Sequence, residues 1–188
     1  MLVTRAKVLS SRFIWLAVLP FFLGCAKGHN SPAAELGYLG LERERDTNLY
    51  KVRFSSGIDL LEVFEKGKRP IGSMLRCSLG VDEVSANYDD DQYIADGLVS
   101  VVLPARDGED FIYSAVLMFD ENLNEGRSTR MLSADELQHI LDGKQFVPCV
   151  YTATAFGFKA YRSATMRVPV ADILREVGIY LAASCPGE

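Results

Sequence analysis

Short runs of hydrophobic residues, several of them alternating with polar ones, follow one another along the chain from about residue 48. In "NLYKVRFS" the side chains of Tyr50, Val52 and Phe54 would share one face of an extended chain, opposite Leu49 and Lys51. Turn-forming residues separate the runs at distances typical of hairpins. The pattern predicts strands over residues 48–55, 59–67, 73–80, 97–104, 111–119 and 145–158.

Some of these segments carry further information. Residues 59–67 also fit a helix, but the turn signals at both of their ends favour a strand. Residues 97–104 and 111–119 are apolar on both sides and are joined by the polar "ARDGED", which predicts a hairpin in the centre of a sheet. Pro148 would place the strand 145–158 at an edge or give it a bulge.

A different period, close to 3.6 residues, marks two helices. The first, "SADELQHILDG", has Ser133 followed three positions later by Glu136, which is the pattern of a capping box, and it would end at Gly143. His139 would face solvent. The second helix, "PVADILREVGIYLAAS", begins at Pro169 and carries one apolar stripe. The residues expected on the buried side of the first helix are Leu137, Ile140 and Leu141.

Hairpin-like strands with only two helices predict the α+β class. We expect an antiparallel sheet of about five to seven strands with the two amphipathic helices packed on one face. Strands do not alternate regularly with helices, so a doubly wound nucleotide-binding fold is not indicated.

The first 24 residues have the pattern of a secretory signal. Three basic residues and no acidic one precede the apolar run 13–24, which Pro20 interrupts. A transmembrane helix needs about 20 apolar residues, so this shorter run predicts a signal and not a permanent span.

The end of this run, "FLGC", resembles the lipobox of bacterial lipoproteins, with Gly24 as the small residue before Cys25. The resemblance implies that the Cys25 thiol is acylated, that the chain is cut before it, and that the lipid holds the product in the periplasm. By the same resemblance, Ala26 after the cysteine implies sorting to the outer membrane. The alternative is an ordinary signal cut after Ala26, which would release a soluble periplasmic protein without Cys25.

We therefore expect three parts in the chain. Residues 1–24 would be a lipoprotein signal peptide, residues 25–36 a flexible tether, and residues 37–188 a single α+β domain. The tether contains small and polar residues, "AKGHNSPAAE", and its length corresponds to a reach of about 20 Å.

The charge of the chain limits its partners. The leader carries three of the 20 basic residues and none of the 25 acidic ones, so the remaining chain has a net charge of −8. Such an acidic body is not suited to nucleic acid or to anionic lipid, and a partner with a basic surface fits it better.

Three cysteines remain if Cys25 carries a lipid. In an oxidising periplasm two of them should form a disulfide and one should be left over. The sequence allows any of the three pairings among Cys77, Cys149 and Cys185.

Residues that could support catalysis or bind a cofactor are scarce. The two histidines, His29 and His139, fall in the expected tether and on an exposed helix face, and neither a GxSxG elbow nor a glycine-rich phosphate loop occurs. In "DENLNEG", residues 120–126, three polar side chains are spaced like calcium ligands, but Met131 stands where the bidentate Glu is needed, so we interpret the stretch as a hairpin or strand-to-helix loop. We expect no enzyme, cofactor or metal site, and a hydrolase with two convergent carboxylates is a third hypothesis.

The most unusual stretch is "VDEVSANYDDDQYIADG", residues 81–97, which combines six carboxylates with two tyrosines. A solvated loop between strands and a recognition loop both fit this composition. Tyrosine supplies contact area at interfaces, and carboxylates steer a basic partner. The residues expected to contact a partner are Tyr88, Asp89, Asp90, Asp91, Tyr93 and Asp96.

These observations favour a non-enzymatic, lipid-anchored binding protein of the periplasm. Its size, acidity and location resemble those of immunity-type inhibitors, which occlude the active site of an antibacterial toxin, here one with a basic surface. The alternative is a structural or assembly lipoprotein of an envelope or secretion complex, docking by a sheet edge or an apolar patch. The membrane would be reached through the lipid anchor only, and nucleic acid is not an expected partner.

Overall fold

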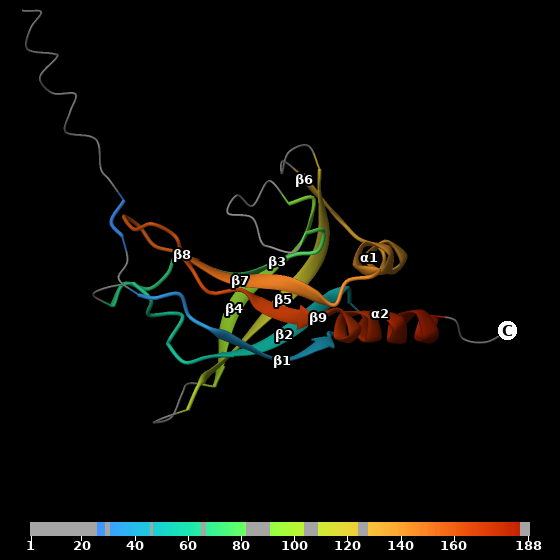
Figure 1. The fold of residues 1–188 in the computed structure, drawn as a ribbon, viewed down its shortest axis with the longest axis horizontal. Helices are drawn as coiled ribbons and strands as arrows, with labels where there is room; N and C mark the ends of the chain where they lie inside the picture. Colours follow the sequence, from blue (N-terminus) through green and yellow to red (C-terminus); the bar gives the residue numbers. More distant parts are fainter. Residues whose placement is uncertain are drawn as a thin grey trace, which may run out of the picture.

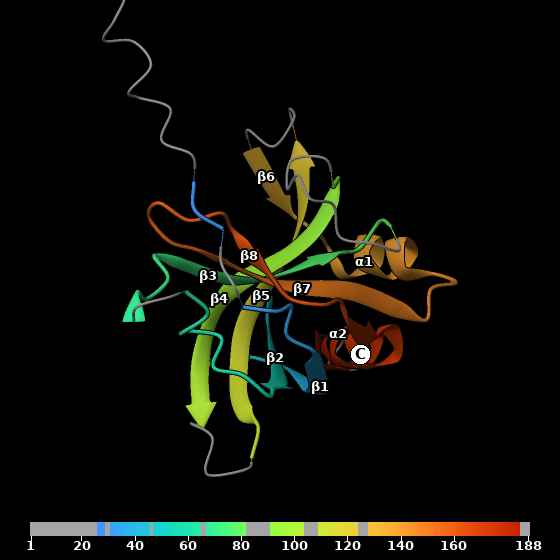
Figure 2. The ribbon, with the colours of Figure 1, turned by 60° about the vertical axis from the view of Figure 1, so that its left-hand side comes forward.

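In the part of the chain that the structure describes, the main element is a nine-stranded sheet whose paired strands are all antiparallel, with two helices lying together on one side of it (Figures 1 and 2). The structure, a computed structural model, describes residues 26–28, 31–45, 47–64, 67–81, 91–103, 109–123 and 128–184, with side chains up to residue 178. The predicted α+β class is confirmed, and the sheet has more strands than the five to seven expected.

The elements are named here in chain order. The strands are β1 (Leu36–Arg43), β2 (Leu49–Ser56), β3 (Gly72–Ser78), β4 (Tyr93–Leu103), β5 (Phe111–Leu123), β6 (Ser128–Met131), β7 (Phe146–Thr154), β8 (Tyr161–Arg162) and β9 (Met166–Pro169). The helices are α1 (Ala134–Leu141) and α2 (Val170–Ser184).

Neighbouring strands follow the order β1-β2-β5-β4-β3-β7-β8, with β6 paired to β5 and β9 paired to β7. The predicted hairpin of residues 97–104 and 111–119 is the pair β4–β5, and its central place in the sheet is confirmed. In this place β4 has a strand on either side, although its residues from Ser100 to Leu103 are exposed.

Four strands were not predicted, and each has a weak sequence pattern. β8 has two residues, and β6 and β9 have four each, which is too short for a period to be recognised. β1 contains Gly37 and Gly40, and glycine is depleted in strands because it has no side chain to pack.

The strand predicted over residues 59–67 is wrong. Residues 59–64 form turns, yet Leu60, Val63 and Phe64 are buried. The Tyr113 hydroxyl accepts a hydrogen bond from the Leu60 amide at 2.9 Å, and the Tyr151 hydroxyl donates one to the Leu60 carbonyl at 2.7 Å. Buried side-chain hydroxyls therefore pair with this backbone where a neighbouring strand was expected.

The sequence predicts the start of α1 correctly and the start of α2 to within one residue, because Pro169 is the last residue of β9. In α1 the Ser133 hydroxyl accepts from the Glu136 amide at 3.3 Å, and the Glu136 carboxylate accepts from the Ser133 amide at 2.9 Å, so the capping box is confirmed. Gly143 follows the helix with a φ of 72°, and His139 is exposed as expected. α2 starts directly after Pro169. Among the described residues, neither helix has the length and apolar character needed to cross a bilayer.

A disulfide joins Cys77 of β3 to Cys149 of β7, which lie directly opposite each other in the sheet. Of the three pairings that the sequence allows, the structure contains this one. Both cysteines belong to the hydrophobic core, so the bond is shielded from solvent. Cys185 lies outside the described residues.

Several described residues of the segment expected to be a tether make specific contacts with the domain. The Ser31 hydroxyl donates to the Val63 carbonyl at 2.7 Å. Ala34 is buried, and its amide donates to the Tyr161 hydroxyl at 2.8 Å, which in turn donates to the Pro32 carbonyl at 2.8 Å. The division of the chain into leader, tether and domain stays a prediction.

Candidate partner-binding surface

The acidic segment connects β3 to β4, two neighbouring strands of the sheet. Residues 82–90, which include the partner-binding candidates Tyr88, Asp89 and Asp90, lie outside the described residues. The described ends of the segment are held together, because the Leu79 amide donates to the Tyr93 carbonyl at 2.9 Å. The expectation that the loop extends to Gly97 is wrong, since β4 already begins at Tyr93.

The remaining three candidates, Asp91, Tyr93 and Asp96, differ in exposure. Asp91 is 8% exposed, so its side chain offers little surface to a partner. Tyr93 is half-buried and packs against the core. Asp96 lies within β4, opposite Arg76 of β3 and Met118 of β5. Of these three residues, Tyr93 is the one that places an aromatic ring at the base of the acidic segment, where a partner could contact its exposed part.

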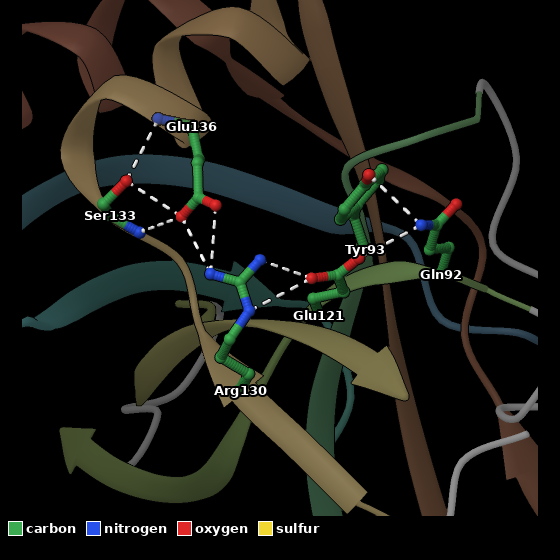
Figure 3. Close-up of polar contacts among 6 residues, drawn as sticks. All are labelled: Gln92, Tyr93, Glu121, Arg130, Ser133 and Glu136. Carbon is green, nitrogen blue, oxygen red and sulfur yellow. Dashed lines mark hydrogen bonds and ion pairs between the residues drawn. The ribbon is translucent and has the colours of Figure 1, made fainter. Parts of the chain in front are cut away.

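Hydrogen bonds attach this base to β5. The Asn122 side chain donates to the Asp91 carbonyl at 2.7 Å. The Gln92 amide group donates to the Tyr93 hydroxyl at 3.2 Å and to the Glu121 carboxylate at 3.1 Å (Figure 3). The acidic segment therefore leaves from a point that is tied to the sheet by side chains as well as by strand pairing.

Arg130 extends the network from β5 to the start of α1 (Figure 3). Its guanidinium binds the Glu121 carboxylate through Nε at 3.2 Å and also through Nη2, and its Nη1 lies 3.0 Å from both oxygens of Glu136. Glu136 is the carboxylate of the α1 capping box with Ser133. β5, β6 and α1 are thus joined at the place where the acidic segment begins.

The network changes the acidity of both carboxylates. The Ser133 amide and hydroxyl, followed by Arg130, lower the pKa of Glu136 to about 2. Hydrogen bonds from Arg130 and then Gln92 lower the pKa of Glu121. Glu136 therefore stays negatively charged to strongly acidic pH, and the lowered pKa of Glu121 likewise favours its charged form, beside a segment that is already rich in carboxylates.

Asp120, the neighbour of Glu121 in β5, behaves in the opposite way. Burial raises its pKa, and the nearby charge of Asp96 raises it further. Of the two interpretations of residues 120–126, a hairpin or a strand-to-helix loop, the structure agrees with the hairpin, because residues 120–123 of β5 pair with β6, Asp120 opposite Met131. Residues 124–127 lie outside the described residues. Among the described residues, no three His, Cys, Asp or Glu side chains come together as metal ligands would.

A hollow of about 200 Å³ lies beside the network. The buried aromatic side chains of Tyr50 and Phe119 and the exposed side chain of Met131 are part of its lining. Pockets of this kind accept the anchoring side chain of a protein partner. The lining residues are Asn48, Tyr50, Phe119, Met131, Leu132, Ser133, Ala134 and Leu137.

The sequence did not indicate Arg130. Its pairing with Glu121 depends on the register of β5 and β6, in which the two residues are directly opposite. The short strand β6 has no recognisable period, so this register becomes visible only in the folded chain.

A second surface was also missed, at the end of the β4–β5 hairpin. β4 pairs with β3 only as far as Leu98, and beyond it β5 is the one neighbour of β4 among the described strands, while β5 itself stays paired with β2. Leu98 is 69% exposed and Leu103 57% exposed, with Val101 and Val102 also at the surface. The sequence pattern predicts that the strand 97–104 is covered on both faces, but the residues at the end of β4 are exposed.

We compared the chain with protein-family profiles, curated proteins and solved structures, and none of them matches. The fold and the surface therefore define only a general class: an α+β domain with an acidic segment whose base is hydrogen-bonded to the sheet.

Proposed function

We propose that this chain is a non-enzymatic, lipid-anchored binding protein of the bacterial periplasm, an immunity-type inhibitor that neutralises an antibacterial toxin. The observation that supports this proposal is a polar network that attaches the base of the acidic segment to β5, β6 and α1. The network consists of Gln92, Glu121, Arg130 and Glu136. The lipid would be attached at Cys25 and would hold the protein at the outer membrane.

The rigid base supports this proposal on energetic grounds. A recognition loop loses less entropy on binding when its ends are already held in place. Here one end follows the disulfide-linked strand β3, and the other is bound to β5 through Gln92 and Asn122.

The negative charge of the acidic segment indicates a partner with a positively charged surface. Six carboxylates within residues 81–97, together with Glu121 and Glu136 beside them, create a negative field that would attract a cationic active-site cleft. Tyr93 and the apolar hollow next to α1 supply non-polar contacts that such a complex needs at its centre.

Competition between sibling cells tests the proposal. A strain that lacks this protein should be killed by its parent strain, and the wild-type gene should restore survival. The variant Asp89→Lys with Asp90→Lys should fail to restore it, because the charge of the segment is reversed. The matched control, Glu109→Lys with Asp110→Lys, makes the same change in net charge at the β4–β5 connection and should protect fully. Equal survival of the deletion strain and its parent would contradict the inhibitor function.

The exposed hairpin end favours a second candidate, an assembly lipoprotein of an envelope or secretion complex. Exposed apolar side chains on both faces of the end of β4, which lacks a second neighbouring strand among the described residues, are typical of a docking element. In this case the variant Leu98→Ser with Val102→Ser should release the protein from a large complex in detergent-solubilised envelopes, as measured by size-exclusion chromatography. If wild type and variant both elute at the size of the single chain, the assembly role is wrong.

A further inference from the structure

The end of the molecule away from the helices exposes two large apolar side chains. Phe156 is 88% exposed and Ile71 is 78% exposed, the highest values among the large hydrophobic residues described. They belong to two connections, residues 155–160 after β7 and residues 67–71 before β3, which lie at the same end as residues 26–28 (Figures 1 and 2). We call these three segments the basic end, for the reason given below.

The basic end is built by backbone hydrogen bonds. The Lys27 amide donates to the Gly157 carbonyl at 2.9 Å, and the Lys159 amide donates to the Lys27 carbonyl at 2.9 Å. The Ile71 amide donates to the Thr154 carbonyl at 2.8 Å. All three segments are therefore attached to the end of β7.

A turn holds Phe156 at the tip of this end. The Phe158 amide donates to the Ala155 carbonyl at 3.2 Å, and Gly157 has a φ of 81°, the conformation that the third position of a type II turn requires. The next aromatic ring, Phe158, turns inward and packs against Phe64 at 5.4 Å between ring centroids. The turn thus leaves Phe156 exposed, while Phe158, two positions later, is partly buried against the core.

Basic residues occur in the same three segments as these apolar residues. The three segments contain Lys27, Lys68, Arg69 and Lys159 and no acidic residue. The ammonium groups of Lys68 and Lys27 lie 5.2 Å and 5.9 Å from the centre of the Phe158 ring. Although the chain as a whole is acidic, screening limits the reach of exposed charges to about 10 Å, so this end presents a local positive charge.

The basic end is also the place where the N-terminal segment joins the domain. Cys25 precedes Lys27 by two residues, and consecutive Cα atoms are 3.8 Å apart, so its Cα lies within about 8 Å of the Lys27 Cα. A lipid on Cys25 would bring this end, and no other, against the bilayer. This step rests on the lipid attachment that is part of the proposed function.

We propose that the basic end lies on an anionic phospholipid surface, with Phe156 and Ile71 at the boundary between head groups and acyl chains. The membrane would then be contacted by the domain itself and not only through the anchor. A basic patch beside an acyl chain provides the second signal that stable membrane attachment requires. Each Lys or Arg near an anionic bilayer strengthens the association about fivefold.

Fluorescence quenching in a reconstituted membrane tests this orientation. The only tryptophan of the sequence is Trp15, in the expected leader, so a new tryptophan acts as a local reporter. We would produce the full chain as Phe156→Trp and as Phe146→Trp, and reconstitute the processed proteins into vesicles of phosphatidylethanolamine and phosphatidylglycerol that contain brominated lipid. The unsubstituted chain measures any signal from Trp15.

Phe146 is the matched control because it is the partly exposed phenylalanine at the other end of β7. The two ends of this strand are about 26 Å apart, given its eight residue steps. We expect brominated lipid to quench the emission of the Phe156→Trp variant at least twofold more than that of the Phe146→Trp variant. Equal quenching of the two variants, or none in either, would overturn the proposal.

Charge reversal provides a second readout. Lys68→Glu with Lys159→Glu, added to Phe156→Trp, should reduce the quenching to the level of Phe146→Trp. Arg45→Glu with Arg167→Glu makes the same change in net charge at exposed sites elsewhere and should leave the quenching unchanged. If both pairs reduce it equally, overall charge and not this surface controls the contact, and the proposal is wrong.

The mass of the purified protein shows whether the chain is acylated, and this distinguishes failure of the membrane-facing surface from failure of the lipid anchor. An acylated chain whose Phe156→Trp emission is not quenched overturns the membrane-facing surface and leaves the anchor and the inhibitor function standing. A chain without acylation and without quenching overturns the anchor and the surface together. Preferential quenching of Phe156→Trp supports the surface in either form of the chain.

Discussion

Arg130 shows how one side chain can connect parts of the chain that the sequence keeps apart. It binds Glu121 of β5 on one side and Glu136 of α1 on the other. Such an exposed ion pair stabilises a fold little by itself, but Arg130 shares the Glu136 carboxylate with the capping box of α1. The main effect of Arg130 is therefore to hold β5, β6 and α1 in fixed positions at the base of the acidic segment.

At this scale we predict a change in the acid stability of the protein. Glu136 has a folded-state pKa of about 2, below its ordinary value of 4.5, so the charged form favours the folded state above about pH 5 and this contribution is lost as the pH falls towards 2. The variant Glu136→Gln should therefore lose less Tm than wild type between pH 5 and pH 2, as measured by circular dichroism.

Glu109→Gln serves as the control for this measurement. It removes one carboxylate that is exposed and lies outside the network. It should retain the wild-type loss of Tm on acidification. Identical pH profiles for wild type and Glu136→Gln would mean that the capping box contributes nothing to acid stability.

At the scale of elements, the pair β4–β5 forms the centre of the sheet and depends on one glycine. A Cβ atom at Gly97 would overlap the carbonyl of Val116 in β5, and the backbone of a central strand has little freedom to move away. Of the described glycines, Gly97 is the one that leaves the least room for a Cβ atom.

We predict opposite effects for the same substitution in two elements. Gly97→Ala should lower the free energy of unfolding by about 1–3 kcal/mol, because the two strands must separate to admit the methyl group. Gly178→Ala in α2 should raise it by about 0.5–1 kcal/mol, since that position is exposed, open and helical. Urea denaturation measures both values. A neutral Gly97→Ala would show that the strands tolerate a wider separation.

At the scale of the whole molecule, the disulfide joins the two halves of the chain. Cys77 and Cys149 are separated by 72 residues, and a crosslink that closes a loop of this length stabilises a fold by about 4 kcal/mol on chain-entropy grounds. The bond also connects β3, which precedes the acidic segment, to β7, which ends at the basic end. It therefore lies between the two surfaces to which we assign functions.

We predict that reduction weakens the whole domain. Cys77→Ala with Cys149→Ala should lower the Tm by about 10 °C, and a reducing agent should lower the Tm of wild type to a similar value without affecting the double variant. Cys185→Ser should keep the sensitivity to reductant. Differential scanning calorimetry provides the measurement, and a wild-type Tm that reductant does not change would contradict a stabilising disulfide.

Local patterns in the sequence determined the central hairpin, the two helices and the capping box, because each depends on residues that are close together in the chain. The α+β class followed from them. The tertiary structure alone decided the partner of Cys77, the pairing of Arg130 with Glu121, and the turns at residues 59–64. Each of these depends on strand register or on buried hydroxyls contributed from distant positions. The basic end also depends on the tertiary structure, because its lysines and Phe156 come from three segments that meet only after the chain has folded.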